Sequence, residues 1–396
     1  MKIVVPTLLI EKIKDNITIE PNLSELKVKQ EQKLIKRLIE LWYFIYHKQI
    51  NDNKSINLKY FVNVHKDELM IFKIEVGGIR LHYTKLLSLL YNLVERNETY
   101  SSGSFSYGYR IKTDFISFGK LTEFEIDFNL IFKETKNKEF WIEKYPNQKN
   151  LIEDAYNTTI DLDEYLFWLK DNIGCELNPV YNKKTGFIEK RFLTEERLYQ
   201  YFNMALKINL KNIWFKISNE GRFYSSISNL PKSAVQFIKL YNEKTIAIDI
   251  TNCQPLLLST MINNQKYKQD CVDGIFYDVL ERTLSDESST SRNEVKLLCY
   301  KYIFFGSKTL SSGKLYSAME KEYKGVITQI NNIKQDKCLA KTLQEIESDI
   351  FVNKIGKIRI PKLLRHDEVI VSLSNQERIK DYLIKEFNNI NIKLKV

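Results

Sequence analysis

IPKLLRHDEVIV, residues 360–371, places a His-Asp-Glu triplet, with Asp367 at its centre, between two apolar runs. An acidic residue that is followed closely by β-branched residues is typical of a carboxylate at the bend of a β-hairpin. TIAIDI, residues 245–250, is a second apolar strand with an acid, Asp249, near its end. Carboxylates at two neighbouring strand ends suit a pair of Mg²⁺ ions that assist phosphoryl or nucleotidyl transfer.

The bulk composition is that of a globular, basic protein. Its 396 residues are enough for two or three domains with substantial cores. Hydrophobic residues make up 43% and aromatic residues 12% of the chain, which excludes an intrinsically disordered protein. The formal net charge of +10 favours a polyanionic partner, because attraction to phosphates raises both affinity and association rate. A protein from a lysine-rich proteome would have the same charge, so the charge supports nucleic-acid binding but does not establish it.

The cysteine pattern and the hydropathy of the sequence indicate where in the cell the protein would be found. The five cysteines are scattered, with no C-x-x-C pair and no histidine at ligand spacing, so neither a zinc site nor a disulfide framework is expected. The apolar residues 3–10 are broken by Pro6 and lack a small-residue cleavage site, which argues against a signal peptide. No run reaches the roughly 18 apolar residues of a membrane helix. We therefore expect a cytoplasmic protein with no membrane partner, in a bacterial or phage-infected host cell.

The first half of the chain has helical and strand-like patterns but no catalytic motif. Residues 24–50 carry apolar residues at three- and four-residue spacing, which predicts an amphipathic helix, and a second helix is predicted over 83–96. Residues 105–132 alternate apolar with polar residues and predict strands. A charged, proline-containing stretch follows. We therefore expect an N-terminal α/β domain over residues 1–150 and a connector over 151–215.

Four short segments in the second half occur in an order that is known from one polymerase family. They are EGRFYSSISNLP at 220–231, Asp249, the Arg-x-x-x-Lys helix start at 292–296 and the His-Asp-Glu triplet at 366–368. This order resembles the family A (DNA polymerase I-like) nucleotidyl transferases. That family carries a T-G-R-L-S-S…N-L-Q segment, motif A with its catalytic Asp, an R-x-x-x-K fingers helix and an H-D-E motif C. The resemblance covers roughly residues 215–390, about half of the chain.

The resemblance implies an α+β fold with the right-hand architecture of polymerases. Residues 216–396 would form a palm built on an antiparallel sheet, with helical fingers inserted at about 265–330. The thumb would come from residues 151–215. The α/β domain over residues 1–150 has no assigned role, and because it lacks the D-x-E signature of an exonuclease, we expect no proofreading.

Asp249 and Asp367 would be the catalytic pair. In the family these acids bridge two Mg²⁺ ions, which Mn²⁺ can replace, and the backbone carbonyl of Ile250 would be a further ligand. Such a metal pair activates a primer 3′-hydroxyl and stabilises the leaving pyrophosphate. The two acids are far apart in the sequence, so the fold has to bring them together; each alone could be a strand-end cap. Glu368 would lie partly buried beside the site and tune it without binding metal.

Arg292 and Lys296 are expected to bind the incoming nucleotide. They are four positions apart, so both project from one face of a helix. In the family such a pair holds the β- and γ-phosphates, as basic residues do in other phosphoryl-transfer sites. An i,i+4 basic pair is also common on a solvated helix face, and only the resemblance favours the functional interpretation.

The aromatic residues that follow Lys296 depart from the family pattern. Tyr300 and Phe304 lie on the same predicted helix face and would stack on a nucleobase or sugar, although an aromatic stripe at this spacing is more often core. The family's terminal Tyr-Gly best matches Phe305-Gly306, one residue later than expected. Either the helix carries an extra residue, or Phe304 is the stacking residue.

Gln254 leaves the choice of sugar open. DNA polymerases of the family carry a Glu five residues after the motif A Asp, where it blocks a ribose 2′-hydroxyl. Gln254 occupies this place and has similar bulk but no charge. Single-subunit RNA polymerases, a related group, do not keep the Glu either, whereas the His-Asp-Glu triplet fits the DNA-polymerising branch better.

The remaining matches would contact the primer and template. Arg222 matches the family's Arg at the primer terminus, whereas Pro231 replaces a Gln and so removes one hydrogen-bonding side chain. The segment 344–350 resembles the family's Q-G-T-A-A-D-I helix, which approaches the template. His366 would face the primer's terminal phosphate, or it could be a structural hydrogen-bond partner. The expected nucleic-acid-binding residues are Arg222, Asn229, Lys337, Lys341, Gln344 and His366.

The leading hypothesis is a template-directed DNA polymerase of a phage or mobile element, which extends a DNA primer with dNTPs and does not proofread. A primase or small single-subunit RNA polymerase that uses NTPs is the alternative, favoured by Gln254. Template-independent nucleotide addition is a further one. A catalytically inactive nucleic-acid-binding scaffold is the hypothesis from another class, and the presence of Asp249, Asp367, Arg292 and Lys296 argues against it.

Overall fold

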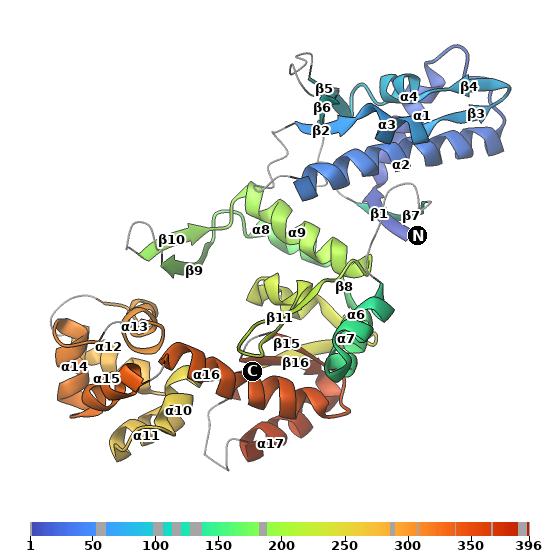
Figure 1. Cartoon of the computed structure of the whole chain (residues 1–396). Helices are drawn as coiled ribbons and strands as arrows, with labels where there is room; N and C mark the ends of the chain where they lie inside the picture. Colours follow the sequence, from blue (N-terminus) through green and yellow to red (C-terminus); the bar gives the residue numbers. More distant parts are fainter. Residues whose placement is uncertain are drawn as a thin grey trace. The chain divides into compact units, whose positions relative to one another are not determined.

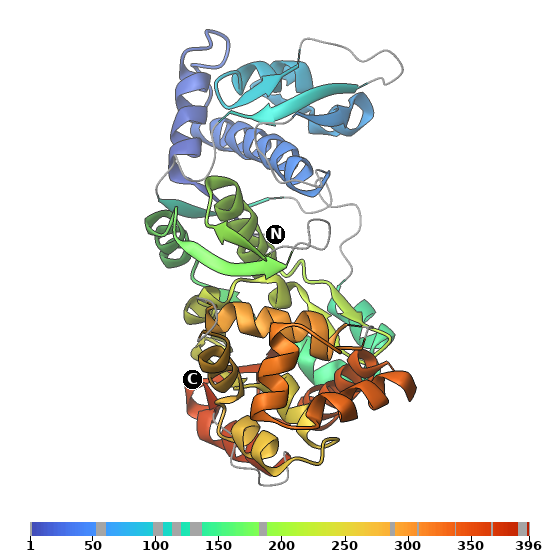
Figure 2. The ribbon, with the colours of Figure 1, turned by 90° about the vertical axis from the view of Figure 1, so that its left-hand side faces the viewer.

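The computed structural model of the chain describes most of its residues (Figures 1 and 2). His366 and Lys337, two of the expected nucleic-acid-binding residues, lie outside the described ranges. No helix within these ranges is both long and apolar enough to cross a membrane. The described residues are 2–52, 61–97, 106–112, 120–126, 137–181, 188–285, 290–306, 309–336, 338–365, 367–386 and 394–395.

The chain divides into two compact units whose segments alternate along the sequence. The first unit consists of Met1–Thr135, Leu162–Ile173 and Thr194–Leu210, and the second of Lys136–Asp161, Gly174–Leu193 and Lys211–Val396. Two helices of the expected connector, α8 (Leu162–Asp171) and α9 (Glu195–Asn209), therefore belong to the first unit, where they pack against each other.

The first unit combines helices with small antiparallel sheets. The long helix predicted near residues 24–50 is confirmed as α2 (Val28–Asp52), and its apolar stripe is buried. The helix predicted over 83–96 is wrong in its second half. There α4 spans only Tyr83–Leu89, and Val94–Arg96 forms β5, where a β-branched residue suits a paired strand. The other elements are β1 (Lys2–Pro6), α1 (Thr7–Thr18), β2 (Val62–His65), α3 (Lys66–Leu69), β3 (Ile74–Val76), β4 (Ile79–Leu81), β6 (Ser106–Ile111) and β7 (Leu121–Glu125).

A six-stranded antiparallel sheet forms the centre of the second unit (Figure 1). Its strands follow the order β15-β16-β14-β13-β8, and β17 pairs with the end of β14. The hairpin predicted at 360–371 is confirmed, with Arg365 opposite Glu368. β16 is buried along its whole length, as expected for a strand rich in Val and Ile. The strands are β8 (Thr158–Ile160), β13 (Ile238–Leu240), β14 (Glu243–Ile250), β15 (Lys362–Arg365), β16 (Glu368–Ser372) and β17 (Leu394–Lys395).

A helical insertion, residues 253–358, connects β14 to β15. As predicted, the segment between the two candidate acids is helical, and Figure 2 brings these gold to orange helices to the front. The protein is therefore a mixed α+β fold with antiparallel sheets. The helices of the insertion are α10 (Cys253–Ser259), α11 (Gln265–Val272), α12 (Phe276–Ser285), α13 (Arg292–Cys299), α14 (Lys314–Glu322), α15 (Val326–Asp336), α16 (Leu339–Ser348) and two π-helical turns, Tyr300–Phe304 and Asp349–Lys354.

The rest of the second unit supports the sheet and its edges. Helix α7 packs against β15, and α17 packs against β14 and β16. A 3-10 helix, Lys232–Phe237, precedes β13 and also packs against β14. The further elements are α6 (Lys138–Lys144), α7 (Lys149–Tyr156), β9 (Glu176–Tyr181), β10 (Ile188–Phe192), β11 (Phe215–Ile217), β12 (Phe223–Ser225) and α17 (Gln376–Glu386).

A buried polar group fixes the start of β15. The carboxylate of Asp154, on α7, accepts hydrogen bonds from the backbone nitrogen of Lys362 at 3.0 Å and from the hydroxyl of Tyr241 at 3.1 Å. The Lys362 side chain is fully buried, and its Nζ donates to the carbonyl oxygens of Ile358 and Ile360. Burial lowers the pKa of Lys362 to about 8 and raises that of Asp154 to about 6. The lysine is thus held by carbonyl groups at the entry to the candidate hairpin.

Lys362 should make stability increase with pH. Its pKa is about 8 in the folded protein and ordinary for lysine, 10.5, in the unfolded chain. Between these values the unfolded chain binds a proton that the folded protein does not, so raising the pH favours folding, by up to about 1.4 kcal/mol per pH unit. Urea unfolding at a series of pH values should show this rise in wild type and a smaller rise in Lys362→Met, in which other buried lysines such as Lys296 still contribute. The exposed Lys244→Met serves as control and should keep the rise; identical pH profiles for wild type and Lys362→Met would contradict this role.

Candidate active site

The fold brings Asp249 and Asp367 together. β14 and β16 pair so that Asp249 lies opposite Glu368, the residue next to Asp367. Beyond this pair, the backbone nitrogen of Ile250 donates to the carbonyl oxygen of Asp367 at 3.5 Å. Asp367 follows Arg365 by two positions and thus lies in the turn of the hairpin. The expected pair therefore sits at one end of two adjacent, register-locked strands.

The acids at this end differ in burial and in partners. Asp249 keeps 19% of its side chain exposed, whereas Glu368 keeps 4%. Burial raises the pKa of Asp367, and the nearby charge of Asp249 raises it further. Glu368 forms an ion pair with the buried Arg365, and burial also raises the pKa of Glu368. Glu368 therefore has its own cation, which leaves Asp249 and Asp367 as the acids available to a ligand.

Lys232 is a third cation at the site, and sequence reasoning missed it. Its Nζ lies 3.0 Å from Asp249 Oδ2 and 3.8 Å from Glu368 Oε2. Burial alone would lower the pKa of Lys232, but Asp249, Glu368 and Asp367 together raise it. Lys232 is a single lysine after Pro231 and belongs to no sequence motif that would mark it as a site residue. Only the packing of the 3-10 helix against β14 could have revealed it.

The two acids fit a divalent metal that is shared with a substrate. Among the residues that the structure describes, no group of three or more His, Cys, Asp or Glu side chains could hold a metal ion. Mg²⁺, however, is usually bound by one or two carboxylates and completed by substrate phosphates and water. A cation between Asp249 and Asp367 would relieve the repulsion that raises the pKa of Asp367. Ile250, whose carbonyl was expected as a further ligand, is the last residue of β14.

Of the two basic residues on α13, Lys296 is the one whose pKa responds to the acids. Burial lowers the pKa of Lys296, and the charges of Asp367 and Asp249 act in the opposite direction. Arg292 turns to α12 instead. Its Nε donates to Asp278 Oδ1 at 2.6 Å, and its guanidinium lies 5.6 Å from the centre of the Tyr277 ring. In this conformation Arg292 is engaged by Asp278, so the two basic residues of α13 have different partners.

A π-helical turn accounts for the extra residue after Lys296. The backbone nitrogen of Phe305 donates to the carbonyl of Tyr300, a five-residue step that accommodates one more residue than an α-helical turn. A helix that carries an extra residue was one of the two expected alternatives, and a π-helical turn is compatible with it. Phe304 is fully buried and offers no surface for stacking, whereas Phe305 is 37% exposed. A Cβ on Gly306 would lie 2.3 Å from the Lys301 carbonyl oxygen, so the turn requires glycine here.

Tyr300 links this turn to the acids. The Nζ of Lys296 lies 5.6 Å from the centre of the Tyr300 ring, and the ring meets those of Phe304 and Phe305 edge-on. Burial raises the pKa of the Tyr300 hydroxyl, and the charge of Asp367 raises it further. The phenol therefore stays neutral, and its ring contacts both Lys296 and the exposed Phe305.

A buried ion pair joins three of the predicted segments. Glu347 Oε2, on α16, accepts from Arg222 Nη2 at 2.7 Å and from Gln254 Nε2 at 2.5 Å. Gly221, at φ +84°, lets the chain pass so close to α16 that its Cβ would lie 3.3 Å from Ser348. Burial raises the pKa of Glu347 although Arg222 opposes this. Sequence reasoning assigned roles to Arg222 and Gln254 but not to their shared partner, because no local pattern marks it.

The other expected contact residues lie near the surface or outside the described ranges. Asn229 is exposed at the end of a 3-10 turn, and Gln344 is half-buried on α16. Lys341 is exposed on the same helix and pairs loosely with Glu345, at 3.7 Å. For Lys337 and His366 there is no described placement. None of these residues therefore has a described contact with the acid pair.

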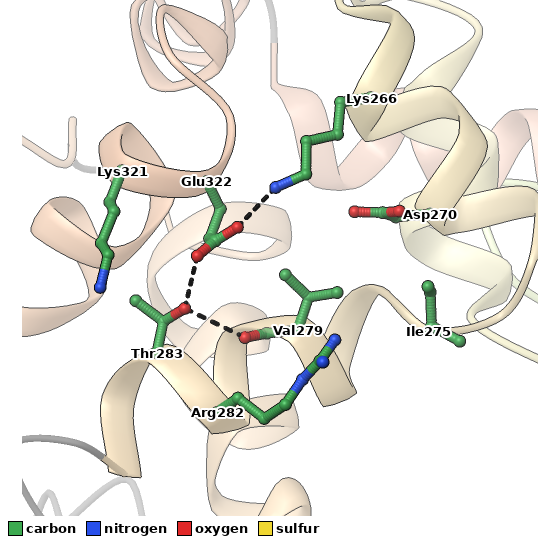
Figure 3. Close-up of a pocket in the computed structure, with 8 residues that line it drawn as sticks. All are labelled: Lys266, Asp270, Ile275, Val279, Arg282, Thr283, Lys321 and Glu322. Carbon is green, nitrogen blue, oxygen red and sulfur yellow. Dashed lines mark hydrogen bonds and ion pairs between the residues drawn. The ribbon is translucent and has the colours of Figure 1, made fainter.

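A pocket of about 650 Å³ lies elsewhere in the helical insertion, between α11, α12 and α14 (Figure 3). At its centre Glu322 accepts from Lys266 at 2.5 Å and from Thr283 at 2.7 Å, and these bonds lower the pKa of Glu322. Figure 3 shows Arg282 and Lys321 at the margin of this group. Glu322 thus ties three helices together, and the pocket lining does not include Asp249 or Asp367.

Glu347 should be essential to the stability of the second unit. Glu347→Leu removes the carboxylate partner of the mostly buried Arg222 and the acceptor of the Gln254 amide, which should lower the free energy of unfolding by roughly 3 kcal/mol. The matched control is Glu345→Leu, two residues earlier on α16 and half exposed, which should change it by less than about 0.5 kcal/mol. Urea unfolding measures both. Equal effects of the two substitutions would show that the buried ion pair is not a stabilising element.

Comparisons with protein-family models and with curated proteins find nothing that matches this chain. The chemistry therefore has to be inferred from the side chains themselves.

Proposed function

We propose that the protein is a divalent-metal-dependent nucleotidyl transferase that extends a primer on a template, with DNA synthesis as its leading activity. The observation that carries the proposal is the adjacency of Asp249 and Asp367 on β14 and the β15–β16 turn, whose charges also act on the amine of Lys296. In this proposal the six-stranded sheet is a palm, the helical insertion supplies the fingers, and residues 151–215 contribute a thumb. The enzyme would be of the family A type and come from a phage or mobile element.

The acids would act by holding metal at the reacting phosphate. Asp249 and Asp367 offer hard oxygen ligands on a rigid pair of strands, which suits two Mg²⁺ ions, or Mn²⁺, completed by nucleotide phosphates. Bound there, the metal supplies activation of the primer hydroxyl and stabilisation of the leaving pyrophosphate. Glu368 would keep its ion pair with Arg365 and hold the hairpin turn that carries Asp367.

Lys296, Tyr300 and Phe305 would receive the nucleotide. The Lys296 amine, on which the charges of both acids act, would bind the triphosphate as a point charge. The exposed Phe305 ring would offer a face to a nucleobase, and the buried part of Tyr300 would hold that ring in place. Arg292 would join the phosphates only after leaving Asp278, so nucleotide binding would require a side-chain rearrangement on α13.

Nucleic-acid contacts would follow from the surface residues on the same unit. Lys341 and Gln344 lie on α16, and Asn229 is exposed after β12, so these side chains are accessible to a strand. Arg222 is committed to Glu347 and would act by fixing the loop that carries it more than by direct contact. The net charge of +10 supports a phosphate-rich partner.

RNA synthesis is the second candidate, and Gln254 is the observation that favours it. A carboxylate only accepts hydrogen bonds, so the amide nitrogen of Gln254 must face Glu347. Its Oε1 is buried and has no hydrogen-bond partner among the described residues. If nucleotide binding uncovers this oxygen, it can accept a hydrogen bond from a ribose 2′-hydroxyl, whereas a deoxyribose has no donor there.

The catalytic assignment predicts a specific loss of activity. Asp249→Asn and Asp367→Asn should each reduce incorporation of labelled nucleotide on a primed template by at least about a hundredfold, because each removes a metal-binding charge. Asp273→Asn is the matched control and should keep activity, because within the described ranges the Asp273 side chain bonds to Gln269 on α11 and not to either site acid. Far-ultraviolet circular dichroism should show all three variants folded. Full activity in both site variants would refute the proposed mechanism.

Sugar choice separates the two candidates. Wild-type protein is given a primed template with either dNTPs or NTPs, and products are resolved on a denaturing gel. Extension with dNTPs is the expected result for a DNA polymerase. Exclusive use of NTPs would reject the leading candidate and support the RNA-synthesising one, whereas extension without template would point to a terminal transferase.

A further inference from the structure

Two cations from different segments, Arg365 on β15 and Lys232 at the start of a 3-10 helix, differ in exposure and pair with the acids. Arg365 is buried, its Nη1 donates to the carbonyl oxygens of Leu230 and Pro231, and its Nη2 pairs with Glu368. Lys232 comes directly after those two carbonyl groups, and 58% of its side chain is exposed. Arg365 is therefore a fixed part of the hairpin, while Lys232 reaches the acids with a flexible, solvent-exposed stem.

Lys232 is the ion-pair partner of Asp249. Within the described part of the chain, the 3.0 Å contact to Lys232 Nζ is the only ion pair that Asp249 makes. Glu368, 3.8 Å from the same amine, already has Arg365. Lys232 therefore mainly neutralises Asp249, one of the two acids that we propose as metal ligands.

A metal ion and the Lys232 amine cannot both bind the carboxylate of Asp249 at the same time. A divalent ion bound by this carboxylate would lie about 2 Å from an oxygen. An ammonium group at its present position would then be close to it, and the two positive charges would repel each other. The exposed stem gives Lys232 room to move away, which Arg365 lacks.

We propose that Lys232 is an exchangeable counter-cation of Asp249, one that neutralises the acid in the metal-free protein and is displaced when a divalent ion binds. This inference rests on the proposed function, because it takes Asp249 as a metal ligand. Lys232 is thus a positioning residue that sets the metal affinity of the site. It keeps the acids paired between turnovers and limits metal binding in the absence of nucleotide.

The test is direct Mn²⁺ binding to the full chain, without nucleotide, measured from the electron paramagnetic resonance signal of free Mn²⁺. Lys232→Met removes the competing charge at similar length and should bind Mn²⁺ roughly three- to tenfold more tightly than wild type. Lys232→Arg restores the charge and should return the affinity to near the wild-type value. Lys239→Met removes a lysine of β13 that pairs with Asp161, and it should leave the affinity unchanged.

The outcomes separate this inference from the proposed function. Asp249→Asn, measured in parallel, reports whether the site binds metal at all. If Asp249→Asn abolishes Mn²⁺ binding but Lys232→Met binds no more tightly than wild type, the counter-cation inference is overturned and the metal site stands. If wild type, Lys232→Met and Asp249→Asn all fail to bind Mn²⁺, both are overturned. Tighter binding by Lys232→Met that Lys232→Arg reverses supports the inference.

Discussion

The pairing of β14 with β16 is the constraint on which the rest of the site depends. Its register places Asp249 opposite Glu368 and next to Asp367, although the helical insertion separates them in sequence. A shift of one residue would turn every side chain of one strand to the opposite face and separate the acids. The apolar, β-branched composition of β14 and β16 holds this register, and the buried Arg365–Glu368 pair fixes β15 against β16, so residues of the core also position the site.

Electrostatic balance explains why so many charges can be partly or fully buried in the second unit. Glu368 has Arg365, Asp249 has Lys232, and Glu347 has Arg222. Asp367 has no ion pair of this kind among the described residues, and its pKa is raised by burial and by Asp249. The imbalance at Asp367 is what a divalent cation would correct. The buried ion pairs thus stabilise the fold. The exposed Lys232 and the incompletely neutralised Asp367 are the charged groups that a ligand would affect.

Local sequence patterns predicted the parts whose cause is local. Alternating and β-branched residues predicted the β15–β16 hairpin, and three- and four-residue spacing predicted α2. The end of α4 was predicted too late in the sequence. Val94 belongs to strand β5 and pairs with β6, and the spacing of apolar residues does not reveal such a pairing. Lys232 and Glu347 could not be predicted, because each acts through partners that only tertiary packing brings near. The π-helical turn was detectable only as one residue too many before Gly306.

The most direct measurement is a crystal structure with Mn²⁺ and a non-hydrolysable nucleotide, with the metal located by anomalous scattering. Metal ligated by the carboxylates of Asp249 and Asp367 and by nucleotide phosphates, with Lys296 near those phosphates, is the predicted result. Nucleotide bound elsewhere, or anomalous peaks that avoid both carboxylates while Lys232 still pairs with Asp249, would contradict the central claim that these two acids form a metal-dependent nucleotidyl-transfer site.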